Sequence, residues 1–141
     1  MTLTETLLRL SSAVLAGIFI GLERQWHHKD AGLRTNTLVV LGACLFVLIS
    51  EKLTYNEGGD ATRIIGQVVT GIGFLGGGVI IREGFNVKGL NTAATLWCSA
   101  AIGCMSGLGF YIEALFGTFA ILVVNLFLRF IEERFLIRPE K

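Results

Sequence analysis

Charged side chains are scarce in this 141-residue sequence. Only 16% of its residues are Asp, Glu, Lys or Arg, whereas about a quarter of the residues of a soluble domain are charged. There is also one proline, and the only histidines are the adjacent pair His27 and His28. Two neighbouring histidines do not make a His-rich metal site, so we expect no metal and no cofactor. The net charge of +1 argues against nucleic acid as a partner.

Hydrophobic residues make up 52% of the chain, and the mean hydropathy is +0.66. Charges fall almost entirely between long uncharged runs, one of which covers residues 64–81. A membrane-spanning helix needs about 20 mostly apolar residues. The pattern predicts an all-α membrane protein, a single domain over residues 1–141 built as a bundle of five transmembrane helices. The expected spans are residues 5–22, 36–53, 64–81, 91–107 and 110–131.

Lys and Arg are distributed unevenly over the two sides of this bundle. With five spans, nine of them lie on the side of the C-terminus, and three, Arg9, Lys52 and Arg63, lie on the other side. The positive-inside rule then places the N-terminus outside and the C-terminus in the cytoplasm. The N-terminal residues MTLTETLLRL lack a basic region and a cleavage site. We therefore expect the first helix to stay attached, in a multi-pass protein surrounded by membrane lipids.

Gly71, Gly73 and Gly76 fit the dinucleotide-binding pattern G-x-G-x-x-G. That pattern also requires an acidic residue about twenty positions later, but no Asp or Glu occurs between Gly84 and Ile112. The alternative is close helix packing, because small residues let helix backbones approach each other in lipid. The expected packing glycines, within one chain or between chains, are Gly17, Gly21, Gly73, Gly76, Gly77 and Gly78, with Gly66, Gly103 and Gly107 in the same spacing.

The run Gly76–Gly78 leaves two interpretations of the third helix open. Each glycine costs about 1 kcal/mol against alanine in a helix interior, so the helix could be broken beside a binding site. It could equally be straight and tightly packed. Gln67 and Asn125 lie within spans, where interhelical hydrogen bonds are the default and a substrate path is the alternative.

Polar residues collect in three segments on the expected cytoplasmic side, at 21–36, 82–97 and 129–141. Asn91 or Thr92 is placed to cap the fourth helix, and Thr92, Thr95, Ser99 and Ser106 recur on one of its sides. The helix N-terminus could attract anions, although ordinary positive-inside loops explain the same charges. Cys44, Cys98 and Cys104 match no zinc or redox motif. No catalytic set can be assembled from these residues, so we expect no enzyme.

Three segments carry a resemblance to a known family: GLERQWHHKDAGLRTNTLV, GIGFLGGGVIIREG and VKGLNTAATLWCSAAIG. They resemble the signature segments of the MgtC/SapB family over residues 15–125. The resemblance implies a bacterial inner-membrane protein with five spans. In the MgtC branch it implies a link to growth at low magnesium and survival inside macrophages, through regulation of other membrane proteins. The partners implied are the F-type ATP synthase and a P-type magnesium-transporting ATPase.

The resemblance also implies functional positions. The Glu-Arg pair of the family matches Glu23 and Arg24, and its Gly-Leu-Arg-Thr motif ends in Arg34 and Thr35. Its Arg-Glu-Gly loop begins with Arg82 and Glu83, and its sensitive Asn and Cys match Asn91 and Cys98. Many members continue into a soluble C-terminal domain. This sequence ends at Lys141, so we expect the membrane domain alone.

Two functional hypotheses follow. The first is a non-enzymatic membrane regulator that packs against itself, as a dimer, and against larger membrane proteins. The second is a small transporter or channel subunit for an ion or small solute, with a site at a broken third helix and the cap of the fourth. Ion flux in liposomes, sensitive to Asn91→Ala, would distinguish the second from the first.

Overall fold

The protein folds as a bundle of long helices. The structure is a computed structural model, and it describes residues 2–54, 61–132 and 134. Arg138 and Lys141, two of the basic residues counted above, lie outside the described residues. The elements are α1 (Leu3–Trp26), α2 (Leu33–Thr54), α3 (Ala61–Val79), β1 (Ile81–Glu83), β2 (Asn86–Lys88), α4 (Leu90–Leu108), α5 (Tyr111–Val123), the π-helical turn η1 (Val124–Leu128) and α6 (Arg129–Ile131).

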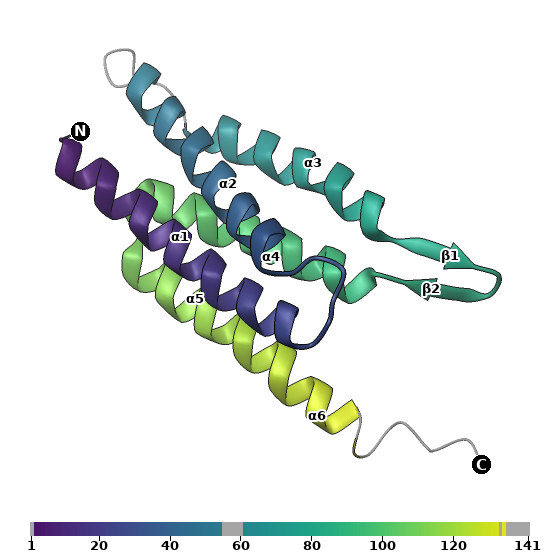
Figure 1. Ribbon diagram of the computed structural model, residues 1–141. Coiled ribbons are helices and arrows are strands. Elements are labelled where there is room, and N and C mark those ends of the chain that lie inside the picture. The colour runs from purple at the N-terminus through teal and green to yellow at the C-terminus, as the bar shows by residue number, and fades with distance from the viewer. Residues whose placement is uncertain (1, 55–60, 133, 135–141) are drawn as a thin grey trace.

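The all-α bundle expected from the sequence is found, and its helices extend beyond the predicted spans by a few residues at several ends. Among the described residues, three segments are long and apolar enough to cross a membrane: Leu3–Trp26, Leu33–Leu53 and Tyr111–Ile131. α3 and α4 have 19 residues each and are not among them. The expected fifth span is one continuous rod of α5, η1 and α6 (Figure 1).

α1 starts with a capping box that sequence analysis did not identify. The Thr2 hydroxyl accepts a hydrogen bond from the Glu5 amide at 3.2 Å, and the Thr2 amide donates to the Glu5 carboxylate at 2.8 Å. Such reciprocal bonds satisfy two backbone donors that a helix end otherwise leaves open. The first helix therefore begins at Leu3, two residues before the predicted start.

α4 is the central helix, since it contacts α1, α2, α3 and α5. α3 lies beside α2 and α4 at one edge of the bundle, and α5 lies beside α1 and α4 at the other edge (Figure 1). The end of α1, the start of α2, the β1–β2 hairpin, the start of α4 and α6 all gather at one end of the bundle (Figure 1). We call this end the polar end.

Glycines allow the central helices to approach closely. A Cβ added at Gly17 or Gly21 of α1 would lie 2.6 Å from the Cα of Thr37 or 2.7 Å from the Cα of Leu33 in α2. A Cβ at Gly103 of α4 would overlap the carbonyl oxygen of Val40 in α2. Because backbone atoms occupy this space, any side chain at these positions would force the helices apart.

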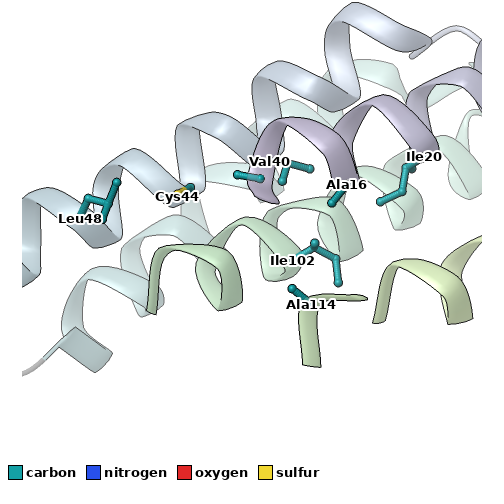
Figure 2. Packing of buried hydrophobic residues seen from close by; sticks show 8 residues of the cluster. Ala16, Ile20, Val40, Cys44, Leu48, Ile102 and Ala114 are labelled. Atoms are coloured by element: carbon teal, nitrogen blue, oxygen red, sulfur yellow. The ribbon is translucent and has the colours of Figure 1, made fainter. Parts of the chain in front are cut away.

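The hydrophobic core is built mostly from small and branched side chains. Figure 2 shows Ala16 and Ile20 of α1 facing Val40 and Cys44 of α2, with Ile102 and Ala114 beneath them. A second cluster, of Ala43, Val47, Leu96, Ala100 and Cys104 with Ala31 and Ile72, joins α2, α3 and α4. Cys44 and Cys104 are buried in these clusters as free cysteines, where they pack like small hydrophobic side chains.

The third helix is continuous, so the interpretation of a broken helix is wrong. α3 runs from Ala61 to Val79 and includes Gly76–Gly78. Of the four glycines expected to pack here, only Gly76 approaches α4: its added Cβ would lie 3.5 Å from the Cβ of Ala93. No atom lies within 4 Å of a Cβ added at Gly73, Gly77 or Gly78. The packing predicted for these three is absent within the described part of the chain.

The connection between α3 and α4 is a short antiparallel hairpin that the sequence analysis left as a loop. Ile81 pairs with Lys88, Arg82 with Val87 and Glu83 with Asn86. Gly84 has φ 63° at the first of the two loop positions, which is where hairpin turns of the type II′ class require glycine. The hairpin makes α3 and α4 antiparallel neighbours, as the short connection predicts.

We predict that Gly103→Ala destabilises the bundle by about 1–3 kcal/mol, because its methyl group overlaps the Val40 backbone. The matched control is Gly66→Ala in α3, whose Cβ meets nothing within 4 Å. This control should be neutral or gain up to about 1 kcal/mol from helix propensity. Unfolding of both variants in detergent measures the difference. Equal stability of the two would contradict close packing at Gly103.

Candidate functional site

A cluster of polar side chains fills the polar end between α1, α4 and η1. Arg24 is 3% exposed and lies in the last turn of α1. Its Nη2 donates a hydrogen bond of 2.9 Å to the hydroxyl of Thr92, which is also buried, in the first turn of α4. This bond joins the end of one helix to the start of another, 68 residues apart in sequence. The predicted residues Arg24 and Thr92 therefore meet.

Glu23, the residue before Arg24, joins α1 to η1. Its side chain is 6% exposed. One carboxylate oxygen accepts a hydrogen bond from Asn125 Nδ2 at 3.1 Å, and the other lies 3.0 Å from His27 Nδ1. The interhelical hydrogen bond expected for Asn125 is thus confirmed. The π-helical turn that carries Asn125 was not predicted, and such turns occur frequently at functional sites.

The start of α4 differs from the prediction. Its N-cap is Gly89, with φ 88° and no capping hydrogen bond from a side chain. The prediction that Asn91 or Thr92 caps this helix is wrong, because both lie inside its first turn. The left-handed φ at Gly89 lets the chain turn from β2 directly into α4. A Cβ added at Gly89 would overlap the carbonyl oxygen of Val79, so the turn also requires the absence of a side chain. Since Thr92 is not the cap of α4, its hydroxyl is available to accept the hydrogen bond from Arg24.

A cavity of about 240 Å³ adjoins this cluster. Its lining is mainly polar and comes from α1, the loop after it, α4, η1 and α6. The lining residues are Glu23, Arg24, Lys29, Asn91, Val124, Asn125, Leu128, Arg129 and Glu132. The cavity thus brings together three predicted site residues: Glu23, Arg24 and Asn91.

Asn36 is a buried polar residue that the sequence analysis missed. It is fully buried near the start of α2, and its Nδ2 donates to the carbonyl oxygens of Ala31 and Gly32 at 2.8 and 3.0 Å. Its Oδ1 accepts a 3.0 Å hydrogen bond from Ser99 of α4. The predicted polar side of α4 is confirmed, since Thr92, Thr95, Ser99 and Ser106 are all buried. The signal for Asn36 was an amide side chain within the predicted span of residues 36–53.

The other predicted site residues lie apart from the cavity. Arg82 and Glu83 are exposed in the hairpin, where Glu83 forms an ion pair of 2.6 Å with Lys88. Arg34 is in the first turn of α2, and Cys98 is half-buried as a free cysteine in α4. Within residues 2–54, 61–132 and 134, no group of three or more His, Cys, Asp or Glu side chains is arranged to hold a metal ion.

A second feature is an apolar groove of about 670 Å³ between α2 and α3. Thr35, Gln67 and the glycines Gly42 and Gly71 interrupt an otherwise hydrocarbon surface. The remaining lining residues are Leu38, Val39, Ala43, Phe46, Ile64, Val68, Ile72, Leu75 and Ala100. Gln67 therefore lines the groove, and Thr35 is the predicted site residue found there.

Comparison with protein families gives a match to the MgtC family over residues 10–134, which includes every residue that lines the cavity and the groove. The chain belongs to the MgtC family. The resemblance noted in the sequence is thereby confirmed. Within this MgtC-family domain, Glu23 and Arg24 are the pair matched to the family motif, and both line the cavity. Arg24 is hydrogen-bonded to α4, and Glu23 is hydrogen-bonded to η1.

Relatives support the same assignment. Protein MgtC of Salmonella typhimurium is 54% identical over 129 residues, which are 92% of this chain and 54% of the relative. Protein MgtC of Brucella abortus is 53% identical over 127 residues, 90% of this chain and 52% of the relative. An uncharacterised protein of Synechocystis is 55% identical, with 92% and 54% covered. The chain spans about half the length of these relatives, and no solved structure matches it.

We predict that Thr92→Val destabilises the MgtC-family domain by about 1.5–3 kcal/mol, because it removes the hydrogen bond that the buried Arg24 donates. Thr92→Ser keeps the hydroxyl and should recover most of that loss. The matched control is Thr70→Val, since the exposed Thr70 hydroxyl donates only to Gly66 of its own helix. Unfolding in detergent measures all three. A Thr92→Val variant as stable as Thr70→Val would refute this contribution.

Proposed function

We propose that this chain is a non-enzymatic, multi-pass protein of a bacterial inner membrane that regulates other membrane proteins by binding them. The observation that carries the proposal is the apolar groove between α2 and α3, with the glycines beside it. Gly42 and Gly71 line the groove, and nothing in the described chain lies within 4 Å of a Cβ added at either position.

A transmembrane helix of another protein is the occupant that this groove fits best. Helices in lipid gain little from hiding apolar surface, so they associate where small residues permit close approach and a few polar groups can bond. The groove offers both, since Gly42 and Gly71 leave room for a helix and Gln67 and Thr35 provide polar groups. On α3, no atom of another described residue lies within 4 Å of a Cβ added at Gly73, Gly77 or Gly78, so small residues extend beyond the groove.

The proposed orientation has five spans, with the N-terminus outside and the polar end in the cytoplasm. The support is the excess of basic residues at that end, of which Arg24, Lys29 and Arg34 lie around the connection from α1 to α2. The proposal includes a role in low-magnesium adaptation, which family membership supports, with an F-type ATP synthase or a P-type magnesium ATPase as the proposed partner classes. A two-fold dimer through α3 belongs to the same proposal.

We predict that a photo-reactive phenylalanine analogue at Phe46 forms a discrete adduct with another membrane protein in native membranes. Phe46 is 58% exposed and lines the groove. The same analogue at Phe116 of α5, which is 67% exposed, should give lipid adducts only. Gly71→Trp should fill the groove and abolish the Phe46 adduct while leaving membrane abundance unchanged.

The masses of the adducts separate the outcomes. A Phe46 adduct at twice the monomer mass would assign the groove to a second copy of this chain instead of another protein. Lipid adducts alone from Phe46, equal to those from Phe116, would contradict the groove as a docking site. A protein adduct that persists in the Gly71→Trp variant would do the same.

A further inference from the structure

Arg24 is a buried cation whose partners are incomplete. Its guanidinium donates to the Thr92 hydroxyl through Nη2, and its Nε has no hydrogen-bond partner among residues 2–54, 61–132 and 134. No carboxylate of the described residues lies within ion-pair distance of it. A buried charge is costly unless an opposite charge or several hydrogen bonds compensate it. The surroundings of Arg24 therefore favour an anion.

The neighbouring glutamates do not fill that role. Glu23 lies next to Arg24 in sequence, but its two carboxylate oxygens are directed to Asn125 and His27. Glu132 is exposed at the end of the described C-terminal helix. The cavity lining contains three basic side chains, Arg24, Lys29 and Arg129, against these two acids. The lining thus places further basic side chains next to the incompletely bonded guanidinium.

The first turn of α4 adds to the positive electrostatic potential of the cavity. The Gly89 N-cap has no side chain, so the backbone N–H groups of the first turn lack a side-chain acceptor there. The positive end of the dipole of this 19-residue helix lies beside Arg24, since Thr92 of that turn accepts the arginine hydrogen bond. Asn91 of the same turn also lines the cavity. Hydrogen-bond donors of the Asn91 side chain and basic side chains therefore line the same cavity.

We propose that this cavity binds a phosphate-type oxyanion, held by Arg24 with Lys29, Arg129 and the Asn91 amide. The volume of about 240 Å³ is below the 300–1,000 Å³ typical of drug-sized ligands and suits one compact group. A tetrahedral oxyanion has enough acceptor oxygens for several donors, and guanidinium groups match its geometry. The group could be free inorganic phosphate or the phosphate of an anionic phospholipid headgroup, because both present the same chemistry at a helix end.

The test uses the purified full chain and two probes. Inorganic phosphate is titrated against chloride at equal ionic strength, with binding heat and thermal stability as readouts. The chain is also reconstituted in nanodiscs of phosphatidylglycerol or of phosphatidylcholine. We expect saturable binding or stabilisation by one of these phosphate sources. Arg24→Gln should weaken it about tenfold or more, as expected for the loss of a charge-assisted hydrogen bond. Arg24→Lys should retain part of it.

The controls keep the proposal falsifiable. Arg82→Gln, in the exposed hairpin, should bind like the wild type. If Arg24→Gln does not fold, Lys29→Gln leaves the buried bonds intact and should weaken binding roughly two- to fivefold. A response to free phosphate identifies a soluble anion, and a response to phosphatidylglycerol alone identifies a lipid headgroup. The proposal is overturned by no response to either, by equal binding in Lys29→Gln and Arg82→Gln, or by stabilisation with Mg²⁺ alone that Glu23→Gln removes.

Discussion

The close approach of α1, α2 and α4 is the constraint on which the rest of the structure depends. Backbone atoms of α2 occupy the space that side chains at Gly17, Gly21 and Gly103 would need. Lipid supplies no hydrophobic force between helices, so dispersion and interhelical hydrogen bonds must hold them together. Only at this separation can Ser99 of α4 reach Asn36 of α2. The same packing places the start of α4 against the end of α1, where Thr92 accepts the hydrogen bond from Arg24.

The bundle is asymmetric, and this asymmetry separates its two proposed roles. On one side, the closely packed helices and η1 enclose a small charged cavity at the polar end. On the other side, α3 packs against α4 and against part of α2, and leaves an apolar groove towards α2. The proposed partner helix would lie in this groove, against the surfaces of α2 and α3 that line it. The proposed sites for a partner helix and for an anion therefore lie on different faces, and α4 contributes to both.

Periodicity and charge placement predicted the helical bundle and the buried polar side of α4, because both depend on residue types at regular spacing. Local backbone geometry could not be predicted in the same way. Gly89 caps α4 because β2 must turn sharply into it, and Asn91 looked the better cap by residue type alone. Gly73, Gly77 and Gly78 have the spacing of a packing face, but spacing does not say whether the neighbour belongs to the same chain. The meeting of Glu23 with Asn125, 102 residues apart, required the tertiary structure.

The proposed five-span arrangement requires that α3 crosses the membrane, so that the polar end and the opposite end of the bundle lie on different sides. Lys52 and Phe85 are exposed and lie on either side of α3 in the sequence. A single cysteine is introduced at one of these positions at a time, in a variant whose Cys44, Cys98 and Cys104 are replaced by alanine. A membrane-impermeant maleimide applied to intact spheroplasts should label the cysteine at position 52 and not the one at position 85. Lysis should make position 85 reactive. Equal labelling of both positions in intact spheroplasts would contradict the arrangement.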